Sequence, residues 1–330
     1  MAVDIKLLQY DVEMITESGA RYDLTPYLQS LSWEEQEEGL AQRATMTLQN
    51  TKIKGELLSN IAKINCQIMI YANWGIGRQM VFQGTIWEWN YTSAINKDLT
   101  LTAYDPLIRL QRCKDVKYYS AGMDTKTIVS DICSTWGVSV SYQWDSIKHE
   151  KKSFRAVYVS DMIIQLLKEV KDKTGSKYIL YYKNGSMQIV RWGTNSDIYS
   201  FKFDNVISTH DRLTMDKLVT KVKIIGKEDN KGRTPIEAVV NGRLEFGVFQ
   251  DILIRDSDKS ISEAQKEAQA IIKENGKPDE QIQISAPDLP FLRKGDKVKV
   301  DAGNLTGYFL TSGVTHDATN RLMQMELSRS

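Results

Sequence analysis

Four glutamates crowd one short segment of the sequence, and paired carboxylates are the groups that cleave glycosidic bonds. The segment contains Trp33, Glu34, Glu35, Glu37 and Glu38. A glycosidase needs two carboxylates about 5–9 Å apart, one of them with a raised pKa. Crowded glutamates raise one another's pKa, but this run lies between two strand-like segments beside Gly39. A solvated or partner-facing charge run is therefore favoured over a catalytic pair, and Glu34 and Glu35 become interface candidates.

The histidines and cysteines have no spacing that predicts a metal site, a disulfide framework or a catalytic triad. They are His149, His210, His316, Cys66, Cys113 and Cys133. No CxxC, HExxH or GxSxG motif is present in the sequence. Gly75-Ile76-Gly77-Arg78 lacks the helix and the lysine of a phosphate-binding loop, and a hairpin turn is favoured there. We therefore expect no enzymatic activity, no cofactor and no metal.

Three aromatic residues alternate along one predicted strand. Trp87, Trp89 and Tyr91 occupy positions i, i+2 and i+4, which lie on one face of a strand. Such a strip suits sugar or partner binding, and it equally suits a barrel core or a buried subunit interface. The core or interface interpretation is favoured, and Trp87 and Trp89 are taken as interface candidates.

The composition is that of a globular protein. Of 330 residues, 42% are hydrophobic and 26% charged, and the net charge is +1. No basic excess indicates sequence-specific nucleic-acid binding. The apolar runs fall short of the roughly 18 residues of a membrane span, so membrane insertion is not expected. The first residues alternate without an apolar h-region, which favours synthesis and folding in a bacterial cytoplasm.

The first third of the chain is predicted to be rich in strands. Alternating segments occur at 4–14, 44–48, 64–71, 79–91 and 99–104. Short strands at this spacing, with turn residues between them, predict a small barrel or sandwich. Asp105 followed by Pro106 then predicts the N-terminus of one short helix.

The middle of the chain changes to helices. Asp124 and Ser160 are predicted to cap two amphipathic helices, the second of which ends at Gly175. Asn184-Gly185 predicts a hairpin between two strands. Together these elements predict a compact α+β unit over 113–200.

Strands return in the last third, with one helix among them. The helix is predicted over about 260–275, with a capping box formed by Ser260 and Glu263. Both strand-rich regions end with the same series of elements. A strand and a turn are followed by a strand that begins with an aromatic residue. A turn that contains Asn and a basic residue then leads into a last strand of alternating polar and apolar residues. An internal duplication of one barrel explains this similarity, and two unrelated meanders explain it equally on pattern alone.

The order of short motifs along the chain resembles a known family. The C-terminal motifs are Leu292-Arg293-Lys294-Gly295-Asp296, Gly307-Tyr308-Phe309-Leu310, Val314-Thr315-His316 and Met323-Gln324-Met325-Glu326-Leu327. In the N-terminal half, Leu101-Thr102-Ala103-Tyr104-Asp105-Pro106 and Gly122-Met123-Asp124 agree. The chain resembles the baseplate hub proteins of contractile phage tails, the late-control-protein-D and XkdQ-like families. These occur in phages, in prophages and in phage-tail-like bacteriocins.

The resemblance implies a fold, partners and a mechanism. The fold is β-dominated α+β, with an N-terminal barrel-like domain that docks on the tail tube (1–112), an inserted α+β domain (113–200) and a second, similar barrel-like domain (201–330). Three chains would form a ring of six similar units, which adapts the sixfold tail tube to the threefold central spike. The implied partners are further copies of the chain, the tube protein, the spike and other baseplate proteins, within a released particle.

Two other functions remain open on the sequence. One is a cell-wall-binding or peptidoglycan-degrading protein at the tail tip. The other is a hub-like component of a related injection or secretion machine.

Overall fold

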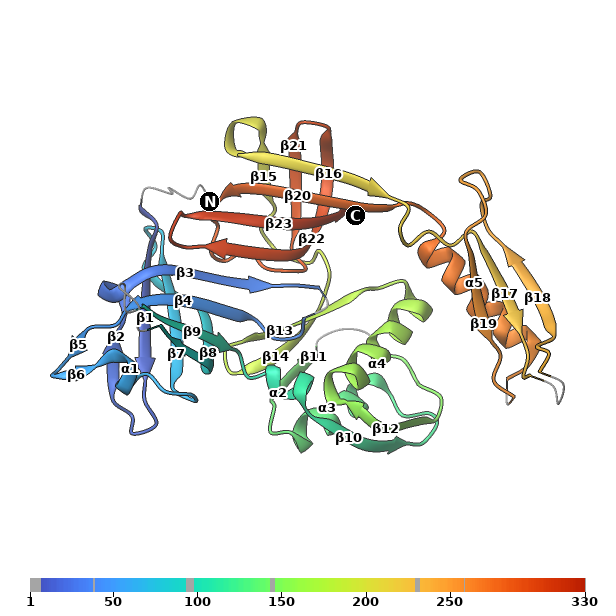
Figure 1. The fold of residues 1–330 in the computed structure, drawn as a ribbon, viewed down its shortest axis with the longest axis horizontal. Helices are drawn as coiled ribbons and strands as arrows, with labels where there is room; N and C mark the ends of the chain where they lie inside the picture. Colours follow the sequence, from blue (N-terminus) through green and yellow to red (C-terminus); the bar gives the residue numbers. More distant parts are fainter. Residues whose placement is uncertain are drawn as a thin grey trace. The chain divides into compact units, whose positions relative to one another are not determined.

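The computed structural model describes residues 7–37, 39–92, 98–142, 146–228, 232–257 and 259–329. The chain is a β-dominated α+β protein, which confirms the expected fold class (Figure 1). Its contacts divide it into a larger unit, Met1–Thr209 with Gln283–Ser330, and a smaller unit, His210–Ile282. Among the described residues, no helix is long and apolar enough to cross a membrane.

A first set of strands in the larger unit forms an antiparallel sheet. The strands are β1 (Gln9–Ile15), β2 (Arg21–Asp23), β3 (Leu28–Glu35), β4 (Arg43–Gln49), β7 (Gln67–Asn73), β8 (Arg78–Tyr91) and β9 (Asp98–Tyr104). Their order in the sheet is β3-β4-β9-β8-β7-β1-β2. Alternate residues face a core, since Met46 of β4 lies opposite Leu101 of β9 and both are fully buried. Three short elements close the set: a 3-10 turn (Thr25–Tyr27), a small hairpin of β5 (Lys52–Ile53) and β6 (Glu56–Leu57), and helix α1 (Leu58–Ile61).

A second set of strands lies in the same sheet, in an order that corresponds to that of the first set. The strands are β15 (Tyr199–Lys202), β16 (Ser208–Thr214), β20 (Asp279–Pro287), β21 (Lys297–Ala302), β22 (Leu305–Asp317) and β23 (Leu322–Arg329), with a 3-10 turn at Phe203–Asn205. Their order is β16-β20-β23-β22-β21-β15. Strands β16 and β20 continue along the chain into the smaller unit. The last residues of β22 pair with the end of β3, from Val314 opposite Glu35 to Asp317 opposite Ser32, which joins both sets into one 13-stranded sheet.

Helices and short sheets occupy the chain between the two sets. The elements are α2 (Ile108–Arg112), β10 (Lys114–Tyr119), α3 (Thr125–Thr135), β11 (Val140–Tyr142), β12 (Lys152–Tyr158), α4 (Val159–Thr174), β13 (Tyr178–Lys183) and β14 (Ser186–Arg191). Strands β10 and β12 pair with each other, and β11, β14 and β13 form a second sheet. The buried faces of α3 and α4 share one hydrophobic cluster with these strands, for example Ile132, Ile163 and Ile189.

Several predicted helix ends and turns are confirmed. Asp124 caps α3 by accepting a hydrogen bond from the Thr127 amide. Gly175 ends α4 in the left-handed conformation, with φ of 75°. Asn184 and Gly185, at φ of 51° and 80°, form the turn between β13 and β14. Both positive values fit residues that tolerate this backbone region.

Two predicted caps are wrong. Helix α4 begins at Val159 with Tyr158 at its N-cap, so Ser160 lies inside the first turn. The helix after Asp105 begins only at Ile108. Asp105 is buried, and its carboxylate accepts hydrogen bonds from the Leu107 amide at 2.9 Å and the Gln42 amide at 3.0 Å. Asp105 therefore holds a chain turn against the β3–β4 loop rather than capping a helix.

The smaller unit is a three-stranded sheet with one helix on it. It contains β17 (Lys221–Ile225), β18 (Ile236–Asn241), β19 (Gln250–Ile254) and α5 (Ile261–Asn275). Strand β17 lies in the middle, antiparallel to β18 and parallel to β19. The predicted capping box of Ser260 and Glu263 is present at the start of α5. These residues lie within the expected 201–330 domain, and their contacts form a compact unit because α5 packs on β17 and β18.

Candidate functional site

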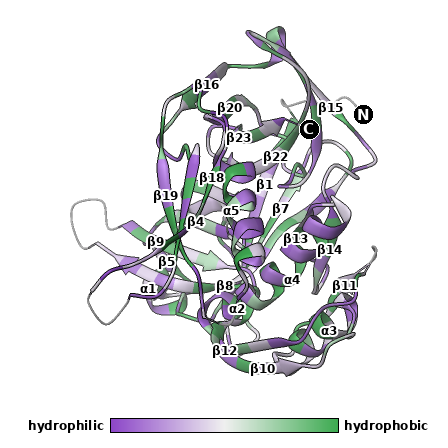
Figure 2. Ribbon diagram, turned by 90° about the vertical axis from the view of Figure 1, so that its right-hand side faces the viewer, coloured by the Kyte–Doolittle hydropathy of each residue, from purple (hydrophilic) through white to green (hydrophobic). Residues whose placement is uncertain are grey.

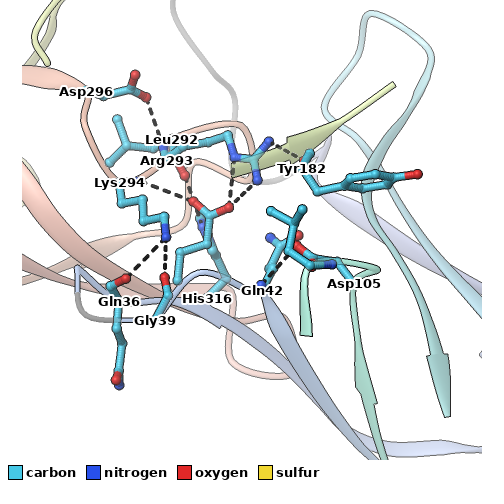
Figure 3. A network of polar contacts seen from close by, with 12 residues as sticks. Gln36, Gly39, Gln42, Asp105, Tyr182, Leu292, Arg293, Lys294, Asp296 and His316 are labelled. Atoms are coloured by element: carbon cyan, nitrogen blue, oxygen red, sulfur yellow. Dashed lines mark hydrogen bonds and ion pairs between the residues drawn. The ribbon is translucent and has the colours of Figure 1, made fainter. Parts of the chain in front are cut away.

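A buried ion pair ties the first set of strands to the connection between β20 and β21 of the second set. Glu35, the last residue of β3, is 2% exposed, and its carboxylate accepts hydrogen bonds from the Arg293 guanidinium (Figure 3). The Nε of Arg293 lies 3.0 Å from Oε1 of Glu35, and the amide of Lys294 donates to Oε2 at 3.2 Å. A carboxylate removed from water in this way needs such partners, since an unpaired buried charge is costly.

Three segments distant in sequence meet at this pair. Arg293 also donates to the carbonyl of Tyr182 in β13, at 3.1 Å. The ammonium group of Lys294 donates to the carbonyls of Gln36 (3.2 Å) and Gly39 in the β3–β4 loop. We call Glu35, Arg293, Lys294 and their partners the ionic junction. It fixes the 292–296 segment against β3 and β13 (Figure 3).

The pKa values around the ionic junction follow from burial and charge. Burial acts to raise the pKa of Glu35, but the charges and hydrogen bonds of Arg293 and Lys294 together lower that pKa. Burial lowers the pKa of Lys294. Burial raises the pKa of Asp105 to about 7 and that of Asp296 to about 6. Shifted carboxyl groups mark many active sites, but buried ion-pair networks produce them equally.

His316 lies within β22, and its ring has a stacking partner as well as a hydrogen-bond partner at each nitrogen. Its ring stacks on Trp33 of β3, with centroids 4.6 Å apart. Its Nε2 lies 3.1 Å from the carbonyl of Leu292, and its Nδ1 lies 2.6 Å from the carboxylate of Asp288. The hydroxyl of Tyr10 donates to the same carboxylate. Because both ring nitrogens have internal partners, His316 supports the β3–β22 contact rather than presenting a free base.

A cavity of 410 Å³ opens beside the ionic junction. Its walls include Trp33, Trp74, Met80, Phe291, Arg293 and His316. The described residues that line it include no aspartate or glutamate, so these residues do not supply the carboxylate pair that a glycosidase uses. Within the described residues, no group of three or more His, Cys, Asp or Glu side chains is arranged to hold a metal ion.

Two of the interface candidates come together on the outer face of the first set. Glu34 and Arg43 are paired across β3 and β4, with a 2.9 Å ion pair. Arg43 lies opposite Tyr104 of β9, and Trp87 meets the Tyr104 ring edge-on at 6.2 Å. We call Glu34, Arg43, Tyr104 and Trp87 the outer row. Beside it lies a hollow of 340 Å³, lined by three of these residues and by Gln111.

The predicted aromatic strip is wrong because β8 carries a bulge. Ile86 pairs with Ala103 and Glu88 with Thr102, so Trp87 is the extra residue. The extra residue reverses the sides of the strand. Trp89 and Tyr91 therefore pack against the core, whereas Trp87 is 43% exposed on the outer face.

The interpretation of the glutamate run as solvated or partner-facing is wrong for Glu35. Glu34 and Glu35 lie on opposite faces of β3, and only Glu34 faces outward. Glu38 lies outside the described residues. Arg293 and Lys294, the partners of Glu35, belong to the C-terminal Leu292–Asp296 motif. No local signal in the sequence pairs them with Glu35, because more than 250 residues separate them from it.

Comparison with known proteins gives a consistent family. A family model described as YQBQ-like matches residues 31–329. The uncharacterized protein YqbQ of Bacillus subtilis (strain 168) is 29% identical over 206 residues, which are 60% of this chain and 61% of YqbQ. The phage-like element PBSX protein XkdQ of the same organism is 22% identical over 205 residues, 60% of this chain and 62% of XkdQ. The matched regions span about three fifths of each relative's length.

The fold is shared with a prophage protein. The crystal structure of the 43 kDa tail protein of prophage MuSo2 from Shewanella oneidensis has a TM-score of 0.70, covering 97% of this chain and 98% of that chain at 15% identity. At that identity the likeness concerns the fold. The resemblance to XkdQ-like proteins expected from motif order is confirmed. Because the family model covers nearly the whole sequence, the chain belongs to the YqbQ-like family.

Proposed function

We propose that the chain is a structural baseplate hub of a phage-type contractile tail. Three copies would form a ring that adapts the sixfold tail tube to the threefold central spike. Its role would be assembly, without a catalytic site or a cofactor. It would be made in the bacterial cytoplasm and incorporated into the baseplate of a released phage or phage-tail-like particle.

The observation that carries this proposal is the repeated strand order. Six strands of the first set correspond one to one with six strands of the second when both are taken in chain order. The six of the first set are β1, β3, β4, β7, β8 and β9, and their counterparts are β15, β16, β20, β21, β22 and β23. Their neighbours in the sheet correspond as well, β3-β4-β9-β8-β7-β1 against β16-β20-β23-β22-β21-β15. The outermost pairs differ, since β1–β7 is antiparallel and β15–β21 is parallel. Two similar barrel-like domains per chain would give three chains six similar units.

The relatives support the same role. XkdQ is named as a protein of a phage-like element, and the Shewanella protein is named as a prophage tail protein. Family membership and a common fold make a tail role the simplest proposal for this chain. In this proposal, residues 1–112 and 201–330 form the two barrel-like domains, and residues 113–200 form the inserted domain. The part of the smaller unit from β17 to α5 is then a further insertion between strands β16 and β20 of the second domain.

The outer row is our candidate for a contact with the tube protein or with a neighbouring hub subunit. Trp87 offers a large aromatic ring against Tyr104, and Tyr104 in turn lies opposite Arg43, which pairs with Glu34. An aromatic group with charged residues beyond it is the composition of an interface centre with a polar rim. Glu35 and Trp89, on the inner side, would hold the same strands in place. Other baseplate proteins would bind elsewhere on the ring.

Solution mass tests the proposal. Light scattering of the purified 37.7 kDa chain, alone and then with a candidate spike protein, should give three chains per particle in at least one condition. A single-chain mass with every tail component would contradict it. Binding to purified peptidoglycan, or clearing of a cell-wall suspension, would instead favour the rival tail-tip function.

A further inference from the structure

The cavity beside the ionic junction is bordered by stretches of the larger unit that lie far apart in the sequence. The β7–β8 hairpin supplies Trp74 and Met80, and β3 with the loop after it supplies Trp33 and Gln42. The turn between β13 and β14 and the connection between β20 and β21 complete the walls. Figure 2 shows hydrophobic residues along β7 and β13, the strands that lead into two of these walls. The volume of 410 Å³ lies within the roughly 300–1,000 Å³ of ligand pockets.

Two buried side chains on these walls carry polar groups that the described part of the chain does not use. Trp33 is 1% exposed; its ring contacts His316 and Tyr10, and no described residue accepts a hydrogen bond from its indole N–H. Gln42 is 6% exposed; its backbone bonds to Asp105, and its side-chain amide has no partner among the described residues. Neither group belongs to the described side-chain atoms that are both sealed from solvent and unpaired, so each borders open space. That space is the cavity, which both residues line.

The polar groups of the cavity indicate what a ligand must offer. Tryptophan and lysine side chains donate hydrogen bonds and accept none, and Trp33, Trp74 and Lys183 are of this kind. The described residues of the lining include no aspartate or glutamate, and both ring nitrogens of His316 already have partners. A ligand that presents acceptors and few donors therefore matches this lining.

Aromatic rings form the apolar part of the lining. Phe291 lies between Trp74 and Tyr199, with ring centroids 5.1 Å and 5.0 Å away. Trp74 and Phe291 both line the cavity and are only partly buried. A proline residue suits both features, because its ring packs on aromatic faces and its backbone has a carbonyl acceptor but no N–H. Proline-rich segments are also extended before they bind, which lowers the entropic cost of binding.

We propose that the cavity binds an extended, proline-rich segment of another protein. Trp33 and Gln42 would donate hydrogen bonds to its carbonyl oxygens, and Trp74 and Phe291 would pack on its rings. The bound segment would thus give partners to polar groups that are otherwise buried and unpaired, a costly condition in a folded protein. This inference goes beyond the proposed hub role, which does not depend on it.

Calorimetric titration of the full chain with an acetylated, amidated hexaproline peptide tests the proposal. We expect saturable binding of one peptide per chain. A glycine–serine peptide of the same length has the same carbonyls but no rings, and it should not bind. Equal binding of the two peptides, or binding of neither, would overturn the proposal. Binding of an N-acetylglucosamine trisaccharide without binding of hexaproline would make the cavity a sugar site and would overturn it as well.

Two variants locate the binding in the cavity. Trp74→Ala should raise the Kd for hexaproline at least about tenfold, since large aromatic residues dominate binding. Gln42→Leu removes the side-chain amide but keeps both backbone hydrogen bonds to Asp105, so the fold should survive and the Kd should rise about two- to tenfold. Tyr118→Ala is the matched control: Tyr118 is a 62% exposed aromatic residue of β10 outside the lining, and its loss should leave the Kd unchanged.

Far-UV circular dichroism of each variant shows whether it folds, and Gln42→Leu decides the matter where Trp74→Ala does not fold. An unchanged Kd in a folded cavity variant would overturn the assignment of the peptide to this cavity. None of these outcomes alters the solution mass of the chain, so the hub proposal is tested separately.

Discussion

The two three-stranded meanders β7–β8–β9 and β21–β22–β23 share a backbone plan but differ in what they present outward. In each, the long middle strand pairs first with the preceding strand and then with the following one. In each, a bulge lies near that changeover, with Trp87 as the extra residue of β8 and Ser312 as that of β22. A repeated backbone with different outer side chains suits a ring that is sixfold in outline and threefold in detail.

The largest expected effect concerns the ion pair that joins the two sets. Arg293→Met leaves the Glu35 carboxylate buried without its main partner, which should lower the free energy of unfolding by about 3–5 kcal/mol. Urea denaturation monitored by tryptophan fluorescence measures this change. Glu34→Ala on the outer face of the same strand should cost about 0–1 kcal/mol, since exposed ion pairs contribute little.

A double variant separates charge burial from packing. Glu35→Leu with Arg293→Met removes both charges, and it should recover most of the stability that Arg293→Met alone loses. Equal losses in the single and double variants would show that side-chain packing, rather than an unpaired charge, holds the two sets together.

The second effect is a pH dependence at the end of the first meander. Burial raises the pKa of Asp105 to about 7. The folded chain therefore binds more protons than the unfolded chain between about pH 4 and 7, and its stability should fall as the pH rises through this range. Each pKa unit corresponds to about 1.4 kcal/mol. Urea midpoints between about pH 5 and 8 should fall less steeply in Asp105→Asn; parallel curves for the two proteins would exclude this assignment.

The third effect compares the glycines at the two changeovers. A Cβ on Gly84 would lie 2.3 Å from the carbonyl oxygen of Tyr104, so the backbone would have to move. Gly84→Ala should cost about 1–3 kcal/mol, in the range of overpacked cores. At Gly313 the nearest atom is the flexible carboxylate of Glu326 at 3.1 Å, and Gly313→Ala should cost less. Thermal unfolding of both variants decides, and the reverse order would show that the meanders are packed differently from this account.

The smallest effect on stability concerns the bulge residues themselves. Trp87→Ala loses one edge-on aromatic contact and should cost about 0.5–1.5 kcal/mol. Ser312→Ala should stay within about 0.5 kcal/mol. If the outer row is an interface, only Trp87→Ala should also weaken binding to the tube protein, by at least about tenfold in Kd. Equal binding by both variants would remove Trp87 from the interface.

Signals between residues close in the sequence predicted most helices, strands and turns. The features that these signals failed to predict depend on contacts between residues far apart in the sequence. The Asp124 cap, the Asn184-Gly185 turn and the Ser260 capping box depend on neighbours within a few residues, so the sequence contains them. The bulge at Trp87 depends on pairing with β9, and alternation alone cannot reveal it. The burial of Glu35 depends on Arg293, a residue from the far end of the chain.

We propose that two similar units per chain make a threefold hub with a sixfold outline. Electron microscopy of the purified oligomer, averaged along its axis, shows this symmetry without any variant. We expect a ring of six similar lobes that obeys threefold rather than sixfold symmetry. A ring with three lobes only, or particles without any ring, would refute the proposal.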